Sequence, residues 1–167
     1  MESEIFGTNI REALIGDISI MAEYHRKMFE EIWEKKGEHL ENVRAIEIEK
    51  AYTQKLETEM NFGACKAWVI EDKGEIISSG AITFVSFVPT PYDVSSKIAY
   101  LHSIYTKQSH RNRKCAQQIV RAAISYCRSH GINTIILDAS NEGKPIYEKI
   151  GFRSTPEMMR LFIDKNT

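Results

Sequence analysis

Residues Ile98 to Tyr126 read IAYLHSIYTKQSHRNRKCAQQIVRAAISY, and this stretch decides the fold. Its first part, up to Thr106, is apolar and rich in β-branched and aromatic residues, which predicts a strand. Residues Lys107 to Lys114 are polar and cationic, so we expect a turn there. Apolar side chains then recur at helical spacing, at Ala116, Ile119, Val120, Ala123, Ile124 and Cys127. The stretch therefore predicts a strand that passes through a short cationic turn into a helix.

The start of this predicted helix is a candidate anion-binding site. The first N–H groups of a helix have no partner within it and carry partial positive charge. Arg111, Arg113 and Lys114 lie around those groups, and each cation there destabilises a helix by about 0.3–1 kcal/mol. A bound polyanion would reverse that effect, and a solvated helix start is the alternative interpretation. We interpret the turn as a phosphate-binding site.

Length and composition indicate one ordinary globular domain. The chain has 167 residues, 43% hydrophobic and 27% charged, with a net charge of −1, which argues against a nucleic-acid or membrane-surface partner. Cys65, Cys115 and Cys127 are widely spaced and predict neither a disulfide framework nor a zinc site. Cys115 is either a packed side chain or a thiol acidified by the helix N-terminus. No signal peptide or membrane span is indicated, so we expect a cytoplasmic protein without a metal.

Strand and helix patterns flank the central stretch on both sides. Asp17 is a good N-cap for the first helix, which runs to about Lys35. The other expected elements are a strand at Asn9–Ala13, a helix at Val43–Met60, strands at Ala64–Glu71 and Glu75–Val88 joined by the hairpin turn Asp72-Lys73-Gly74, a buried strand at Thr134–Ala139, a helix at Glu142–Ile150 and a final strand at Met158–Ile163.

This order predicts an α/β chain of the α+β type, with one mixed sheet and helices on both faces. The N-terminal strands are antiparallel because short turns join them. The strand at Thr134–Ala139 is expected to be parallel to Ile98–Thr106 because a helix separates the two, which makes one right-handed βαβ crossover. We expect a single domain over residues 1–167.

Two segments resemble the GNAT superfamily of acyl-CoA-dependent N-acyltransferases. IYTKQSHRNRKCAQQIV, residues 104–120, looks like the strand end and pyrophosphate loop of that family, whose pattern is Arg or Gln, two residues, Gly, one residue, then Gly or Ala. Arg111 and Ala116 match the ends of the pattern. LDASNEGKPIYEKIGF, residues 137–152, is similar to the family's ending, with a tyrosine on a short helix before a Gly-Phe pair. The resemblance implies a single-domain GNAT-like fold and an N-acetyltransferase that uses acetyl-CoA.

The loop departs from the family pattern at two positions. Lys114 stands where the central glycine falls, and Asn112 stands at a second position that is often glycine. Asparagine tolerates left-handed backbone angles. For Lys114 two outcomes are open. With helical angles its ammonium would add attraction to a pyrophosphate, whereas a positive φ would weaken binding.

The resemblance also implies roles for individual residues. The backbone of Ile104, Tyr105 and Thr106 would pair with the pantetheine arm, and the backbone near Ile104 or Tyr105 would polarise the acetyl carbonyl. Tyr147 would protonate the leaving thiolate. The remaining residues expected to touch the cofactor are Arg111, Asn112, Arg113, Lys114, Cys115, Ala116 and Gln117 in the loop and Asn141, Lys144 and Pro145 before the last helix.

Several residues have a second interpretation from the pattern alone. Tyr147 could be a packed aromatic side chain. His102 lies on the same strand face as Tyr100 and is a candidate general base, with a buried hydrogen-bonded histidine as the alternative. Glu30 and Glu31 could face the substrate cleft or solvent.

Three functions remain open on the sequence. The first is an acetyl-CoA-dependent N-acetyltransferase that acts on a primary amine by direct attack in a ternary complex, as a monomer or a homodimer. The second is a GNAT-like protein that binds acyl-CoA or a partner with little or no catalysis, which the lysine at position 114 would suit. The third is a nucleic-acid binder, which the net charge and the lack of aromatic residues near Arg111 disfavour.

Overall fold

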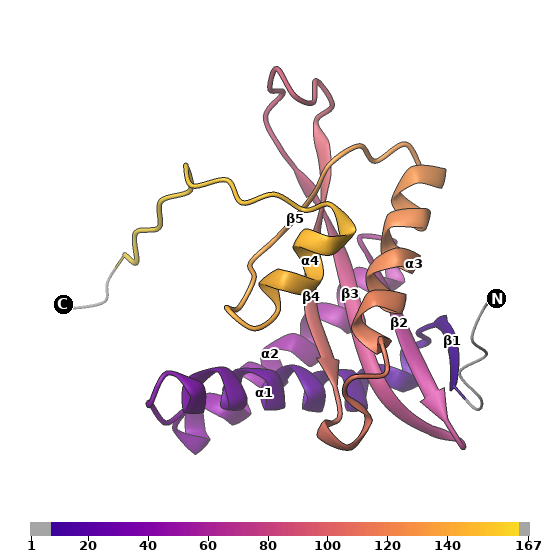
Figure 1. Cartoon of the computed structure of the whole chain (residues 1–167), viewed down its shortest axis with the longest axis vertical. Coiled ribbons are helices and arrows are strands. Elements are labelled where there is room, and N and C mark those ends of the chain that lie inside the picture. The colour runs from indigo at the N-terminus through magenta and orange to yellow at the C-terminus, as the bar shows by residue number, and fades with distance from the viewer. Residues whose placement is uncertain (1–7, 164–167) are drawn as a thin grey trace.

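The computed structural model describes residues 8–163, which form one mixed sheet with helices on both faces (Figure 1). The sheet follows the chain in the order β1-β2-β3-β4-β5. Its strands are β1 (Thr8–Glu12), β2 (Cys65–Asp72), β3 (Glu75–Ser86), β4 (Lys97–Thr106) and β5 (Ile135–Leu137). The helices are α1 (Ile18–Lys35), α2 (Asn42–Asn61), α3 (Cys115–Ser129) and α4 (Lys144–Ile150), with short 3-10 turns at η1 (Ile15–Asp17) and η2 (Gln108–His110).

The strand pairing confirms the expected mixture of directions. Neighbouring strands from β1 to β4 are antiparallel, and β4 and β5 are parallel. Lys73 and Gly74 join β2 to β3 with φ values of 53° and 81°, because a two-residue hairpin turn of this kind needs positive φ at both positions. Helix α3 makes the crossover from β4 to β5, as the stretch 98–126 predicts.

The two faces of the sheet hold separate cores. Helices α1 and α2 cover one face, where Met21, Leu56 and Val69 are buried together. Helix α3 covers the other face, where Ile119 and Val120 pack against Ile82, and the side chains of α4 lie at the edge of that cluster. Figure 1 shows the two helix layers on either side of the strands. The helical spacing in the sequence therefore identified the buried side of α3 correctly.

A β-bulge interrupts β4 opposite Gly80. The pairing runs from Ser79↔Tyr105 to Ala81↔His102, so two residues of β4, Ser103 and Ile104, face one residue of β3. Ser103 has a φ of 58°, a left-handed conformation that costs a residue with a side chain about 1–3 kcal/mol. The bulge shifts the alternation of faces by one residue.

Three details of the predicted elements are wrong. Residues 158–163 form no strand, and Met159 and Leu161 are 95% and 85% exposed. Strand propensity needs a neighbouring edge to pair with, and this segment meets none within residues 8–163. As a result β5 is an edge strand and only half-buried, whereas the sequence predicted a buried one. Asp17 precedes α1 but does not cap it, because its carboxylate accepts from the Leu14 N–H at 2.7 Å and pairs with Arg11.

Among the helices within residues 8–163, none combines the length and the apolar composition needed to cross a membrane.

We expect the bulge to require glycine at position 80, because the bulge brings other side chains close to its Cα. A Cβ at this position would lie 2.3 Å from Ile104 Cδ1 and 2.8 Å from Ile119 Cγ2. We predict that Gly80→Ala lowers the free energy of unfolding by about 1–3 kcal/mol through overpacking, measured by urea denaturation. Gly16→Ala is the matched control, since nothing lies within 4 Å of its added methyl group. Equal stability of the two variants would contradict the prediction.

Candidate active site

The strands β4 and β5 separate on one side of the sheet, and a cleft opens between them. β5 pairs only with Ala99, Tyr100 and Leu101, and β4 continues to Thr106 without a neighbour on that side. The cleft has a volume of about 1240 Å³ and reaches from the loop before α3 to the C-terminal half of α1. A free strand edge offers unpaired N–H and C=O groups to an extended ligand.

The loop before α3 has the backbone shape of an anion site. Asn112 and Lys114 both have positive φ, 64° and 60°, and Arg111 between the loop and η2 is extended. Left-handed residues within a tight turn help to direct successive N–H groups into an anion-binding concavity. No side chain caps the first turn of α3, so its N–H groups remain available to a ligand. The two positions where the family pattern has glycine therefore need positive φ here, and Lys114 adopts it at a cost in strain.

Arg111 lies in the cleft, but its guanidinium is held by the protein. Its Nη2 donates to both carboxylate oxygens of Glu31, at 2.9 and 2.7 Å, and its Nε donates to the Thr106 carbonyl oxygen at 3.0 Å. The Tyr105 hydroxyl donates to the same carboxylate at 3.1 Å. Glu31 therefore faces the cleft, and this cluster ties the loop to the end of β4 and to α1.

The structure brings most of the predicted cofactor residues to this one cleft. They are Ile104, Tyr105, Thr106, Arg111, Asn112, Lys114, Cys115, Ala116 and Gln117, together with both predicted catalytic residues, His102 and Tyr147. Arg113 is not among them, and its guanidinium faces Asp72 with an Nη1–Oδ2 distance of 3.6 Å. Before α4 the wall consists of Ser140, Glu142 and Gly143, whereas Asn141, Lys144 and Pro145 lie outside it.

Tyr147 lies half-buried on α4 at the wall of the cleft. Its ring packs edge-on against Phe152, with ring centroids 5.8 Å apart. Burial raises the pKa of its hydroxyl, because the phenolate is the form that low-polarity surroundings disfavour. No side chain within residues 8–163 is hydrogen-bonded to this hydroxyl, so it is a protonated group available to a ligand.

His102 lies on the opposite wall and is enclosed by hydrogen bonds. Its Nε2 is 2.8 Å from Thr83 Oγ1, and its Nδ1 is 2.9 Å from Ser103 Oγ. Burial, and to a smaller extent Lys55 and His25, lowers its pKa to about 3. Both ring nitrogens are occupied, so His102 could exchange a proton with a substrate only through its neighbours.

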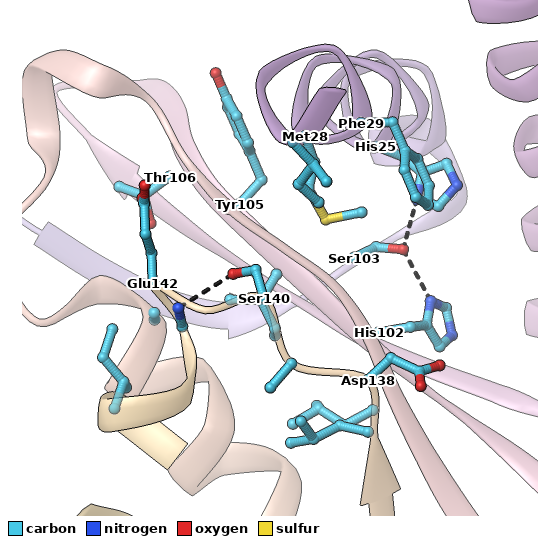
Figure 2. A pocket seen from close by; sticks show the side chains of 18 of the residues that line it. His25, Met28, Phe29, His102, Ser103, Tyr105, Thr106, Asp138, Ser140 and Glu142 are labelled. Atoms are coloured by element: carbon cyan, nitrogen blue, oxygen red, sulfur yellow. Dashed lines mark hydrogen bonds between the residues drawn. The ribbon is translucent and has the colours of Figure 1, made fainter. Parts of the chain in front are cut away.

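His25 and Ser103 are site residues that the sequence analysis missed. Figure 2 shows Ser103 between the two histidines, with His25 on α1 and His102 on β4. His25 Nδ1 lies 2.8 Å from Ser103 Oγ. No local motif marks this cluster, since it depends on the bulge and on the packing of α1 against the sheet.

The cysteines are free thiols and all three are buried. Burial raises the pKa of Cys115, so the thiol at the start of α3 is a packed group and is not acidified. No group of His, Cys, Asp and Glu side chains in the described part of the chain is arranged to hold a metal ion.

A sequence comparison relates the chain to known acetyltransferases. A family model described as "Acetyltransferase (GNAT) domain" matches residues 34–160. A curated relative, glucosamine 6-phosphate N-acetyltransferase from Trypanosoma brucei brucei, is 30% identical over 64 residues. That match covers 38% of this chain and less than half, 44%, of the relative.

Solved structures resemble the chain over nearly its whole length. A predicted acetyltransferase with acetyl-CoA from Clostridium acetobutylicum aligns with a TM-score of 0.81 and 26% identity, over 93% of this chain and 96% of that one. A GCN5-related N-acetyltransferase from Ralstonia eutropha JMP134 aligns with a TM-score of 0.84 and 22% identity, over 93% and 99% of the two chains. The second likeness shows the fold alone.

The backbone at position 114 leads to a stability prediction. Both Lys114→Gly and Lys114→Ala remove the ammonium, but only alanine keeps a Cβ in the left-handed conformation. We expect the glycine variant to have the higher free energy of unfolding, by about 1 kcal/mol, in urea denaturation of the two proteins side by side. An alanine variant at least as stable as the glycine variant would contradict the positive φ at this position.

Proposed function

Because the chain belongs to the GNAT acetyltransferase family, we propose that it transfers an acetyl group from acetyl-CoA to a primary amine, by direct attack in a ternary complex. We also propose that residues 1–167 act as a single N-acetyltransferase domain. The observation that carries the proposal is the cleft itself, where the free edge of β4, the loop before α3 and Tyr147 meet. A homologous structure holds acetyl-CoA, which supports the identity of the donor.

The residues present fit a long polyanionic cosubstrate. The N–H groups from Asn112 to Gln117 suit a pyrophosphate, and the ammonium of Lys114 adds charge beside them. The free edge of β4 from Ile104 to Thr106 suits a pantetheine arm with amide groups of its own. Bound acetyl-CoA would supply the activated acetyl thioester.

The chain's own groups would position the reactants and handle protons. Backbone N–H groups near Ile104 and Tyr105 would hold the carbonyl oxygen and stabilise the charge that develops on it. The Tyr147 hydroxyl would hold a proton for the leaving thiolate, and its raised pKa keeps it protonated at neutral pH. A base on the opposite wall is required as well, because the amine must be neutral to attack. His102, the base expected from the sequence, would take part in this proton transfer through its hydrogen-bonded neighbours, Thr83 and Ser103.

A second function, binding of acyl-CoA without catalysis, is favoured by a specific observation. The guanidinium of Arg111 is held by Glu31, and Lys114 occupies a left-handed position. The ion pair leaves the guanidinium less available to a ligand, and the lysine stands where the family pattern has glycine, so this loop departs from that of the catalytic family pattern. Release of the CoA thiol in the presence of an amine distinguishes the two functions, because a protein that only binds acyl-CoA releases none.

The proposed cosubstrate can be tested by thermal unfolding. Acetyl-CoA at 1 mM is expected to raise Tm, since a ligand at 100 times its Kd stabilises the native state by about 2.7 kcal/mol. A screen of primary amines with detection of released thiol then identifies an acceptor. An unchanged Tm together with no thiol release from any amine would overturn the proposed function.

Tyr147 gives a prediction that separates binding from turnover. Tyr147→Phe keeps the ring that packs on Phe152 and removes the acid, so kcat is expected to fall by about 100-fold while the Kd for acetyl-CoA stays within twofold. Tyr92→Phe is the control, because Tyr92 is 100% exposed in the β3–β4 loop. Unchanged kcat in Tyr147→Phe would show that another group protonates the thiolate.

A further inference from the structure

A continuous row of hydrogen bonds runs from the cleft to α2. It begins at His25, whose Nδ1 lies 2.8 Å from Ser103 Oγ. The next hydrogen bond joins Ser103 Oγ to His102 Nδ1 over 2.9 Å. His102 Nε2 then lies 2.8 Å from Thr83 Oγ1, which donates to Glu59 Oε2 at 3.3 Å. We call these five residues, His25, Ser103, His102, Thr83 and Glu59, the relay.

The carboxylate at the end of the relay sets the direction of every bond in it. A carboxylate only accepts, so Thr83 donates its single hydroxyl proton to Glu59. Thr83 must then accept from His102, which places the His102 proton on Nε2. His102 Nδ1 is left as an acceptor for the Ser103 hydroxyl, and Ser103 in turn accepts from His25 Nδ1. The last group, His25, therefore carries its lone pair on Nε2.

Both histidines are neutral at physiological pH, as this arrangement requires. Burial lowers the pKa of His25 to about 4, and it lowers the pKa of His102 to about 3. A neutral imidazole has one donor and one acceptor nitrogen, so it can receive a proton on one side and release another on the other side.

The Nε2 nitrogen of His25 is the free end of the relay. No described side chain is hydrogen-bonded to Nε2, and no buried side-chain nitrogen or oxygen within residues 8–163 lacks a partner. Nε2 is therefore not fully buried, and His25 is one of the residues that line the cleft. Figure 2 shows the His25 ring beside Met28 and Phe29 on α1.

Tyr52 holds the two histidines in place from α2. Its ring stacks on His25 with centroids 3.9 Å apart, and its hydroxyl lies 3.3 Å from His102 Nδ1. Ser103 is closer to the same nitrogen, at 2.9 Å, and is therefore the better donor to it. If Tyr52 were the donor, Ser103 would turn to His25 and the His25 proton would lie on Nε2, an arrangement that the experiment below tells apart.

We propose that His25 is the base that accepts the proton of the acceptor amine, and that the relay carries this positive charge to Glu59. This inference rests on the proposed function, because it requires an amine in the cleft. It assigns the direct proton acceptor to α1 and gives His102 the role of an internal carrier.

The proton transfers balance at every group. The N–H bond of the ammonium breaks as an N–H bond forms at His25 Nε2. The Nδ1 proton of His25 passes to Ser103, the Ser103 proton passes to His102 Nδ1, and the Nε2 proton of His102 passes to Thr83. Thr83 gives its own proton to Glu59. Each of the four inner groups gains one proton and loses one, so only the amine and Glu59 change charge.

Glu59 can pass the proton on to water. Its side chain is 25% exposed, and it pairs with Lys55 on the outer side of α2, where both carboxylate oxygens lie 2.6 Å from Nζ. Release of that proton to water returns the relay to its starting charge.

The direction of the relay can be measured without substrate or cofactor. Histidine side-chain ¹⁵N NMR of the protein at pH 7 is expected to show His102 protonated at Nε2 and His25 protonated at Nδ1. The opposite tautomer at either histidine would overturn the proposal.

Glu59→Gln should reverse both tautomers. Lys55 would donate to the amide oxygen of the new side chain, so the amide NH₂ group would donate to Thr83. Thr83 would then donate to His102, and each further hydrogen bond of the relay would reverse its direction. Glu57→Gln, on the exposed side of the same helix, is the control and should leave both tautomers unchanged. Unchanged tautomers in Glu59→Gln would show that Glu59 does not direct the relay.

Measurements of kcat distinguish a relay that transfers protons from a hydrogen-bond network that only supports the fold. With the amine that gives the fastest thiol release, Thr83→Val should lower kcat at least about 10-fold, because its methyl group carries no proton. Thr83→Ser keeps the hydroxyl and should retain kcat within twofold, and both variants should bind acetyl-CoA like the wild type. Equal kcat values for valine and serine would overturn the relay while leaving the proposed function intact. A wild type that fails to bind acetyl-CoA would overturn the function instead.

Discussion

The site depends on the β-bulge at Ser103 and Ile104. Strand side chains normally alternate between the two faces of a sheet. Here Leu101 and Ile104 both pack toward α3, whereas His102 and the adjacent Ser103 both face α1 and α2. The bulge therefore places a hydroxyl next to an imidazole on one face and opens a path from the cleft to Glu59. Gly80 permits this arrangement, because a side chain there would overlap Ile104.

The same part of β4 connects the two sides of the chemistry that we propose. One side is the free strand edge and the loop before α3, where the cosubstrate would lie, and the other is the enclosed row of hydrogen bonds toward α2. The ion pair between Arg111 and Glu31 holds the loop to α1, which also carries His25. A shift of α1 relative to the sheet would thus alter the proposed phosphate loop and the proposed base together.

Local patterns predicted much of the fold and part of the candidate site. The 3.6-residue period of 115–127 and the apolar strands identified the crossover, and the loop and the tyrosine helix brought Arg111 and Tyr147 to one cleft as expected. The final strand at 158–163 was wrong because a strand needs an edge to pair with, and no local pattern shows whether the fold supplies one. Before α4, the residues that line the cleft are Ser140, Glu142 and Gly143, and the neighbouring residues expected from the sequence lie outside it. The path of a loop depends on its contacts with distant elements, which a local pattern does not show.

The sequence by itself determined the order and type of the elements up to α4, because these follow from the spacing of apolar and polar residues along the chain, and its resemblance to the GNAT pattern indicated the family and the loop that opens α3. Only the tertiary structure decided that Lys114 is left-handed, that Arg111 is engaged by Glu31 and that His25, Ser103, His102, Thr83 and Glu59 form one row. These residues come from two helices and two strands, and they meet because a bulge changes which face each side chain occupies. A β-bulge leaves no periodic pattern in the sequence.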